Sequence, residues 1–261
     1  MKLFFRKFGQ GQPLIILHGL FGQSDNWNSL AKQFSEQGFE VYTVDQRNHG
    51  LSPHSDVWNY KAMSEDLLEL IKDNDLKNIV LLGHSMGGKT AMQFAVDYPQ
   101  HLDKLIVVDI APKYYAIHHQ GVLEGLQAVD FNLVKTRKEV DEVLSKYISD
   151  FGTKQFLLKN IFWTDEEEMA WRFNLKVITQ QIENVGKEVD DVGKAPSTDL
   201  VCEVQTLFVR GEQSNYVLDE DLDLIQEIFP RSMMDTIPGA GHWVHAEKPK
   251  EFYEAVLKFI K

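Results

Sequence analysis

The stretch that decides the fold is NIVLLGHSMGGKTAMQFAVDYP, residues 78–99. It opens with an apolar run, passes through the letters GHSMG, and then takes on the apolar spacing of a helix. A Gly-x-Ser-x-Gly turn between a buried strand and a helix indicates a nucleophile elbow, in which the serine adopts positive φ and its hydroxyl rises above the sheet. Gly83 and Gly87 let the backbone pass close to neighbouring elements. We therefore interpret Ser85 as a nucleophile rather than a serine that only caps a turn.

Strand-like and helix-like segments alternate on both sides of this stretch. We expect strands at residues 2–8, 13–19, 39–45, 78–83, 104–109, 204–211 and 233–239. Helices are expected at residues 24–38 and 60–75, directly after Ser85, at 218–230 and from Pro249. Such alternation predicts an α/β fold, in which a mostly parallel sheet is flanked by helices on both faces.

The character of the sequence changes after Pro112. From about residue 113 to 196 it predicts helices without buried strands, and the clearest of these helices covers residues 166–186. We therefore expect a core of residues 1–112 and 197–261, interrupted by a helical cap, or lid, at residues 113–196.

The composition limits the partners that the protein can take. The chain has 261 residues and a formal net charge of −12, and no cluster of Lys and Arg stands out, which argues against nucleic acid as the main partner. The apolar run near the start ends after Phe5, too short for a secretory signal, and no stretch is long enough to span a bilayer. The single cysteine, Cys202, can form no intrachain disulfide and lies in no metal-ligand spacing. We expect a cytoplasmic protein without membrane insertion.

A serine nucleophile needs a base, which in this architecture follows the last strand. The segment PGAGHWVHAEKP, residues 238–249, offers His242 and His245. His242 follows a glycine-rich turn directly after the last predicted strand, at the sheet edge where Ser85 emerges. His245 lies three residues further, towards the final helix. We therefore favour His242 as the base.

The acid that orients the histidine is less obvious. The loop after the next-to-last strand usually supplies it, but the expected position in this loop holds Ser214. Asp109 ends the strand that follows the one carrying Ser85, and adjacent strands lie about 4.8 Å apart. Asp109 would therefore emerge close to Ser85, and we favour it as the acid, with Glu212 and Asp219 as competitors.

An oxyanion hole needs two main-chain donors. One is expected from the amide of Met86, directly after the nucleophile, and the other from the loop after an early strand. The segment LHGLFGQSDNW, residues 17–27, fits this loop, with Leu20 as the expected donor.

Together these residues resemble the α/β-hydrolase fold family and, more narrowly, its YbfF-type esterases. The likeness spans nearly the whole chain, and it rests on His18-Gly19-Leu20-Phe21-Gly22, Asp45-Gln46-Arg47-Asn48-His49-Gly50-Leu51-Ser52, Gly83-His84-Ser85-Met86-Gly87-Gly88-Lys89, Asp109-Ile110-Ala111-Pro112, Trp171-Arg172-Phe173-Asn174 and Gly241-His242. The resemblance implies hydrolysis of small to medium carboxylic esters by Ser85, Asp109 and His242 under a helical cap, and leaves acyl thioesters open as substrates. It implies no metal and no organic cofactor. A serine at the elbow excludes the usual dehalogenase and epoxide hydrolase chemistry, which needs aspartate there.

Two rival functions use the same residues. One is a carbon–carbon bond hydrolase or lyase with the same triad, and the other is a ligand receptor on a hydrolase scaffold with negligible turnover. The acidic net charge disfavours anionic substrates such as acyl-CoA unless Lys89, Lys113 or Arg172 supplies local positive charge; surface or helix-end roles are the alternative for these residues. We expect a small-molecule ester as the partner, and the sequence leaves the oligomeric state open.

Overall fold

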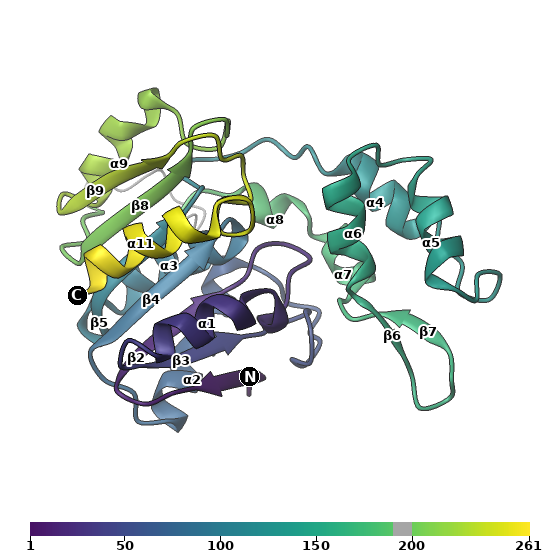
Figure 1. The fold of residues 1–261 in the computed structure, drawn as a ribbon, viewed down its shortest axis with the longest axis horizontal. Helices are drawn as coiled ribbons and strands as arrows, with labels where there is room; N and C mark the ends of the chain where they lie inside the picture. Colours follow the sequence, from purple (N-terminus) through teal and green to yellow (C-terminus); the bar gives the residue numbers. More distant parts are fainter. Residues whose placement is uncertain (190–199) are drawn as a thin grey trace.

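The computed structural model describes residues 1–189 and 200–261, and its centre is a seven-stranded sheet (Figure 1). The strand order is β1-β3-β2-β4-β5-β8-β9. All neighbouring strands pair in parallel except β1, which is antiparallel to β3. The strands are β1 (Phe5–Phe8), β2 (Gln12–Leu17), β3 (Phe39–Val44), β4 (Ile79–His84), β5 (Leu102–Val108), β8 (Gln205–Gly211) and β9 (Ser232–Ile237). The predicted α/β fold with a mostly parallel sheet is confirmed.

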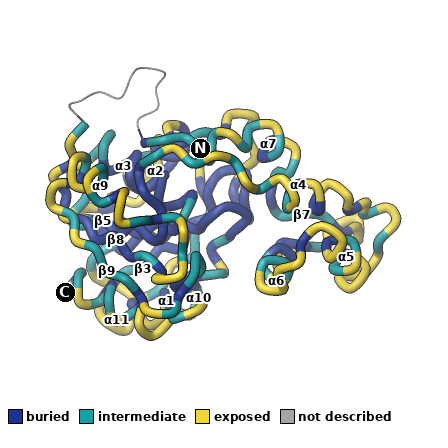
Figure 2. The backbone as a smooth tube through the Cα atoms, turned by 90° about the horizontal axis from the view of Figure 1, so that it is seen from above, coloured by how far each residue is buried: buried dark blue, intermediate teal, exposed yellow. Residues whose placement is uncertain are grey.

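Helices cover both faces of the sheet because successive strand residues point to opposite faces. Leu14 and Ile16 of β2 belong to one apolar cluster, with residues of α1 (Asn28–Ser35) and α11 (Pro249–Ile260). Ile15 and Leu17 belong to the other, with residues of α2 (Tyr60–Asp73), α3 (Met86–Asp97) and α9 (Leu222–Ile228). Figure 2 shows the strands between these layers as buried.

Between β5 and β8 the chain forms a separate group of elements that extends away from the sheet (Figure 1). We call residues 113–189 the inserted segment. Its elements are α4 (Gln120–Gln127), α5 (Arg137–Leu144), α6 (Phe151–Leu158), β6 (Ile161–Trp163), β7 (Met169–Trp171), α7 (Leu175–Gln180) and α8 (Glu183–Gly186). A third apolar cluster joins this segment to Leu20, Phe21 and Met86 of the sheet loops.

The insertion was predicted as helices without buried strands, and it also contains two short, only partly buried strands. The pair β6–β7 lies inside it, and the helix predicted over 166–186 is replaced by β7, α7 and α8. Met169, Phe173 and Val177 are four residues apart, which suits a helix face, but Trp171 instead pairs with Ile161 across the hairpin. Tertiary pairing has thus overridden a helical pattern. The predicted end of the insertion, at residue 196, lies outside the described residues.

No helix in the described part of the chain combines the length and apolar character needed to cross a bilayer.

Candidate active site

The turn between β4 and α3 places Ser85 at the carboxyl edge of the sheet. Its φ is 52° and its ψ is −117°, so φ is positive as the sequence predicted. Its main-chain N–H donates to the oxygen of Val108 at 3.0 Å. A Cβ at Gly83 would lie 2.1 Å from the Gly87 oxygen, and a Cβ at Gly87 would lie 2.5 Å from the Leu17 oxygen. Both approaches are too close for any side chain, so the elbow requires glycine on each side of the serine.

A buried carboxylate at the end of the next strand holds the late histidine. Asp109 follows β5, and its Oδ2 lies 2.7 Å from Nδ1 of His242. The Gly211 N–H donates to Asp109 Oδ1 at 3.0 Å, and the Ser214 hydroxyl donates to Oδ2. Because a carboxylate only accepts, Nδ1 carries the proton and Nε2 keeps its lone pair. This tautomer is the one that a general base requires.

The competing acids and the competing histidine lie elsewhere. Glu212 accepts from the Gly239 N–H at 2.8 Å, and Asp219 pairs with Arg210 at 2.7 Å. His245 is buried and stacks on Trp27 with ring centroids 4.1 Å apart, and burial lowers its pKa to about 3. The geometry therefore favours the pair of Asp109 and His242.

Ser85 and His242 line one cavity. Within residues 1–189 and 200–261 no hydrogen bond joins their side chains, and catalytic hydrogen bonds often tighten only in the substrate complex. His84 connects the two loops, since its Nε2 donates to the His242 carbonyl oxygen at 2.9 Å. Tyr216 stacks on the His242 ring with centroids 3.9 Å apart. The imidazole is therefore held by a carboxylate and an aromatic face, and the His242 main chain is held by His84.

Leu20 lies in the turn after β2, where the predicted oxyanion loop begins. The Gly22 N–H donates to the Gly19 oxygen at 2.9 Å and closes this turn. Met86 is the first residue of α3, where a main-chain N–H has no acceptor within the helix. Leu20, Met86 and Ser85 line the same small cavity. The structure thus brings the two predicted donors and the serine together.

Two buried histidines support this loop. His49 Nε2 accepts from the Phe21 N–H at 3.2 Å, and His18 Nε2 accepts from the Gln46 N–H at 3.0 Å. Burial lowers the pKa of His49 to about 3 and that of His18 to about 4. Both rings are therefore neutral at pH 7 and keep one acceptor nitrogen each. The contact with Phe21 gives His49 a structural role in this loop.

A known protein family matches most of this chain. The family, described as alpha/beta hydrolase fold, matches residues 12–249. This chain belongs to the α/β-hydrolase fold family.

Individual relatives show to which group within this family the chain is similar. The sn-1-specific diacylglycerol lipase ABHD11 of Mus musculus is 39% identical over 254 residues, which cover 95% of this chain and 80% of the relative. Esterase YbfF of Escherichia coli (strain K12) is 36% identical over 250 residues, 95% of this chain and 92% of the relative. The solved structure of a marine microorganism esterase is 44% identical, with a TM-score of 0.94 and 99% of each chain covered. Within the α/β-hydrolases, the chain therefore groups with the YbfF-type esterases.

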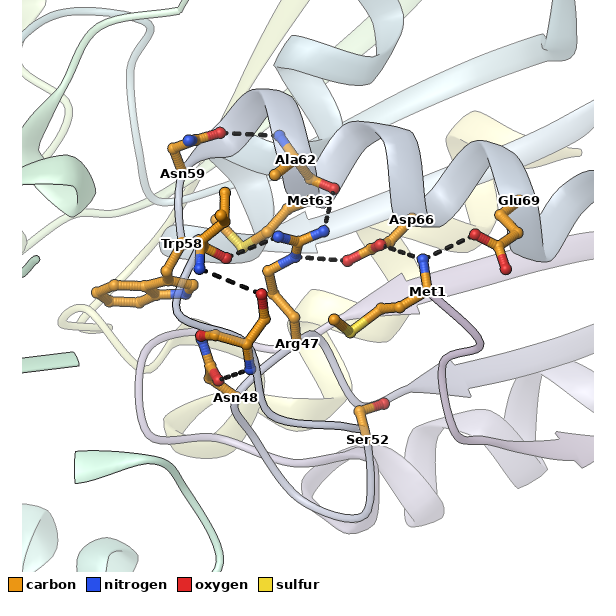
Figure 3. A network of polar contacts seen from close by, with 12 residues as sticks. Met1, Arg47, Asn48, Ser52, Trp58, Asn59, Ala62, Met63, Asp66 and Glu69 are labelled. Atoms are coloured by element: carbon orange, nitrogen blue, oxygen red, sulfur yellow. Dashed lines mark hydrogen bonds and ion pairs between the residues drawn. The ribbon is translucent and has the colours of Figure 1, made fainter. Parts of the chain in front are cut away.

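In this α/β-hydrolase a buried arginine fixes the turn that carries His49 (Figure 3). Arg47 Nε donates to Asp66 Oδ2 at 2.6 Å, and its two Nη atoms donate to main-chain oxygens at 2.7 and 2.9 Å. Asp66 also accepts from the Met1 ammonium at 2.6 Å. Because the guanidinium is buried with a hydrogen bond from each of its three nitrogens, it holds the turn in one conformation.

The inserted segment docks on both loops of this hydrolase core. Asn48, at φ 66°, accepts from the main-chain N–H of Asn174 at 2.9 Å and from its side chain at 3.2 Å. Asn160 Nδ2 donates to the Phe21 oxygen at 2.9 Å, and the rings of Phe21 and Phe173 lie 5.0 Å apart. The motif Trp171 to Asn174 thus joins the insertion to the loop that carries Leu20 and Phe21.

The three cations considered for substrate binding have other partners. The buried ammonium of Lys89 donates to the main-chain oxygens of Lys113 and Lys187 at 2.5 and 2.7 Å. The Lys113 ammonium pairs with Asp221 at 2.7 Å, and the Arg172 guanidinium lies 4.2 Å from the Phe162 ring centroid. No group of three or more His, Cys, Asp or Glu within the described residues could hold a metal ion.

Sequence reasoning missed three supports of the site: the contacts of Ser214, His84 and Asn160. In the sequence, Ser214 is notable only because it occupies the position where the acid is usually found. In the structure its hydroxyl donates to Asp109. Asn160 contacts Phe21 across 139 residues, and no local pattern signals such a contact.

Proposed function

We propose that this ester hydrolase works through an acyl-enzyme on Ser85. His242 Nε2 takes the proton from the Ser85 hydroxyl as Oγ attacks the ester carbonyl, and it returns that proton to the departing alcohol oxygen. Water then repeats the attack and releases the acid. Asp109 keeps Nδ1 protonated and stabilises the charged imidazolium. The observation that carries the proposal is the 2.7 Å contact of Asp109 with His242 beside a serine on a strained elbow.

The oxyanion is proposed to bind between the main-chain N–H groups of Leu20 and Met86. Support comes from their position around one cavity with Ser85 and from the free N–H expected at the start of α3. Because main-chain groups donate, the identity of these two side chains matters little to charge stabilisation.

We propose residues 1–112 and 197–261 as the hydrolase core and residues 113–196 as a cap, or lid. The cap assignment is supported by Val122, Thr153 and Phe156 of the inserted segment, which line the cavity of Ser85. Carboxylic esters with small to medium acyl groups are the proposed substrates, and acyl thioesters react by the same steps. The net charge of −12 supports a small-molecule partner over nucleic acid. We propose a cytoplasmic location, where the buried thiol of Cys202 stays reduced.

The test is Ser85→Ala measured with p-nitrophenyl acetate and with a fluorophosphonate label. We expect turnover to fall by about 10⁴-fold or more and labelling to vanish. Ser145→Ala, at an exposed serine on the inserted segment, is the matched control and should keep both. Wild-type ester turnover by Ser85→Ala would refute the mechanism. Labelling without turnover of any ester would favour a receptor, and turnover of diketones in place of aryl esters would favour the carbon–carbon hydrolase.

A further inference from the structure

Two cavities of very different size adjoin Ser85. The smaller has a volume of about 20 Å³, and its lining includes Leu20, Tyr60, Met86, Ile110 and Val185. The larger has a volume of about 190 Å³, and its lining includes Val122, Phe156, Tyr216, His242 and Trp243. An ester bound at Ser85 extends in two directions from its carbonyl carbon, so the two cavities offer one place for each side of the ester.

The position of His242 decides which side enters which cavity. The group that protonates the departing oxygen must lie within about 2.6–3.2 Å of it. His242 lines the larger cavity and does not line the smaller one. The alcohol side must therefore occupy the larger cavity. The acyl side then occupies the smaller cavity, beside Met86, one of the two proposed oxyanion donors.

The volumes limit what each side can be. One water molecule needs roughly 10–15 Å³ on this measure, and an apolar cavity of about 150 Å³ binds benzene. The smaller cavity, at about 20 Å³, therefore admits one or two heavy atoms beyond the carbonyl. The larger cavity, at about 190 Å³, admits an aromatic ring.

Hydrogen bonds fix the wall of the smaller cavity. The Tyr60 hydroxyl donates to the Val185 oxygen at 2.7 Å, and the Tyr115 N–H donates to the Gly186 oxygen at 2.7 Å. The two chain segments approach so closely that a Cβ at Gly186 would lie 2.1 Å from the Tyr115 oxygen. A longer acyl chain would have to break these contacts to enter.

The two cavities lack lysine, arginine, aspartate and glutamate among the described residues that line them. His119 lines both, and burial lowers its pKa to about 4, so its ring is neutral at pH 7. A charged acyl or alcohol group would lose its hydration here without gaining a partner.

We propose that the enzyme selects uncharged esters in which an acyl group of two or three carbons is joined to an alcohol as large as an aromatic ring. The inference rests on the proposed function, because it needs Ser85 to carry the acyl group and His242 to protonate the alcohol. Val185 and Ile117 limit the acyl group, and Val122 contacts the alcohol.

Two ester series test the wild-type enzyme. In the acyl series, p-nitrophenyl acetate, propionate, butyrate and hexanoate are compared, with rates divided by those of hydroxide-catalysed hydrolysis. We expect kcat/KM to fall about 1000-fold or more from propionate to hexanoate, because each of the three added methylenes costs 10-fold or more in a pocket that cannot accept it. In the alcohol series, benzyl acetate should exceed methyl acetate by about ten-fold. Equal turnover of hexanoate and acetate would overturn the proposal.

Two valines give a matched pair of variants. Val185 lines only the smaller cavity and Val122 only the larger, and both are partly buried against the same apolar cluster. Val185→Ala should raise the butyrate-to-acetate ratio of kcat/KM about ten-fold and leave the benzyl-to-methyl ratio unchanged. Val122→Ala should change only the benzyl-to-methyl ratio. If Val185→Ala changed the benzyl-to-methyl ratio and Val122→Ala changed the butyrate-to-acetate ratio, the assignment of the cavities would be refuted.

Ile117→Ala, which enlarges the smaller cavity as Val185→Ala does, repeats the test if Val185→Ala does not fold. Ser85→Ala distinguishes a failure of the proposed function from a failure of the acyl-length inference. Retained turnover in Ser85→Ala refutes the proposed function, whatever the chain-length profile. If Ser85→Ala loses turnover but the wild-type enzyme prefers hexanoate, only the acyl-length inference is refuted.

Discussion

The imidazole of His84 donates a hydrogen bond from Nε2 to the main-chain oxygen of His242, with the two atoms 2.9 Å apart. The contact ties the loop after β9 to the elbow of Ser85. Burial lowers the pKa of His84 well below its usual value, so the ring stays neutral. We expect His84→Ala to lower kcat by roughly 10- to 100-fold with little change in KM, because misplacement by about 1 Å costs this much. Steady-state kinetics with p-nitrophenyl acetate measures the change, and an unaltered kcat would contradict it.

Asp109 is the second residue whose role a substitution can isolate. Asp109→Asn keeps the shape and tolerates the positive φ of 51°, but an amide cannot enforce the reactive imidazole tautomer. We expect kcat to fall about 10⁴-fold. Glu212→Gln and Asp219→Asn, at the two competing acids, should retain activity. If kcat of one of these control variants fell as much as that of Asp109→Asn, the residue at that position would instead be assigned as the acid.

Buried histidines should make the fold sensitive to acid. His18, His49 and His245 have pKa values lowered by burial to about 4, 3 and 3, against 6.5 when exposed. Above pH 6.5 they are neutral in both states. As the pH falls from 6.5 towards 4, the unfolded chain takes up protons that the folded chain does not, so stability is lost. These three groups alone, at about 1.4 kcal/mol per pH unit each, give a loss of about 4 kcal/mol per pH unit, and the lowered pKa values of His84 and His119 add to it.

Since domains are stable by only about 5–15 kcal/mol, we expect acid unfolding to begin near pH 5. Urea unfolding between pH 5 and 7 measures the slope. His245→Phe keeps a ring against Trp27, and because Nδ1 of His245 is buried and has no hydrogen-bond partner among the described residues, the substitution removes none of the described bonds at that atom. It should reduce the slope by about 1.4 kcal/mol per pH unit. An unchanged slope would show that His245 does not contribute.

Asn160 links the inserted segment to the oxyanion loop, and its loss should affect both. Asn160→Ala leaves the Phe21 oxygen without its 2.9 Å donor in a buried setting, which should cost about 1–3 kcal/mol. The loop that carries Leu20 should loosen, so that kcat falls about ten-fold with KM nearly unchanged. Thermal unfolding and kinetics are measured together. A stability loss with full kcat would assign Asn160 to packing alone.

The elements that could be predicted from the sequence are those with local causes. The apolar run and the glycines around Ser85 specify the strand, the elbow and the helix within 22 residues. The strand after it locates Asp109 because parallel strands end at one edge. The hairpin at Trp171 could not be predicted, since Met169, Phe173 and Val177 around it fit helical spacing equally well. Contacts such as that of Asn160 with Phe21 depend on how two distant segments dock, which no periodicity encodes.

Positive φ angles concentrate around the proposed catalytic centre. Phe21, Asn48, Ser85 and Asp109 have φ of 59°, 66°, 52° and 51°, and each such residue costs of order 1–3 kcal/mol. Glycine would relieve this cost at Ser85, whereas at Phe21 it would also remove a buried ring. Selection of variants for thermal stability alone should therefore favour glycine at Ser85 and yield a sturdier protein that no longer turns over esters. In this enzyme the margin of stability and the capacity for catalysis are opposed at the residue that carries the proposed nucleophile.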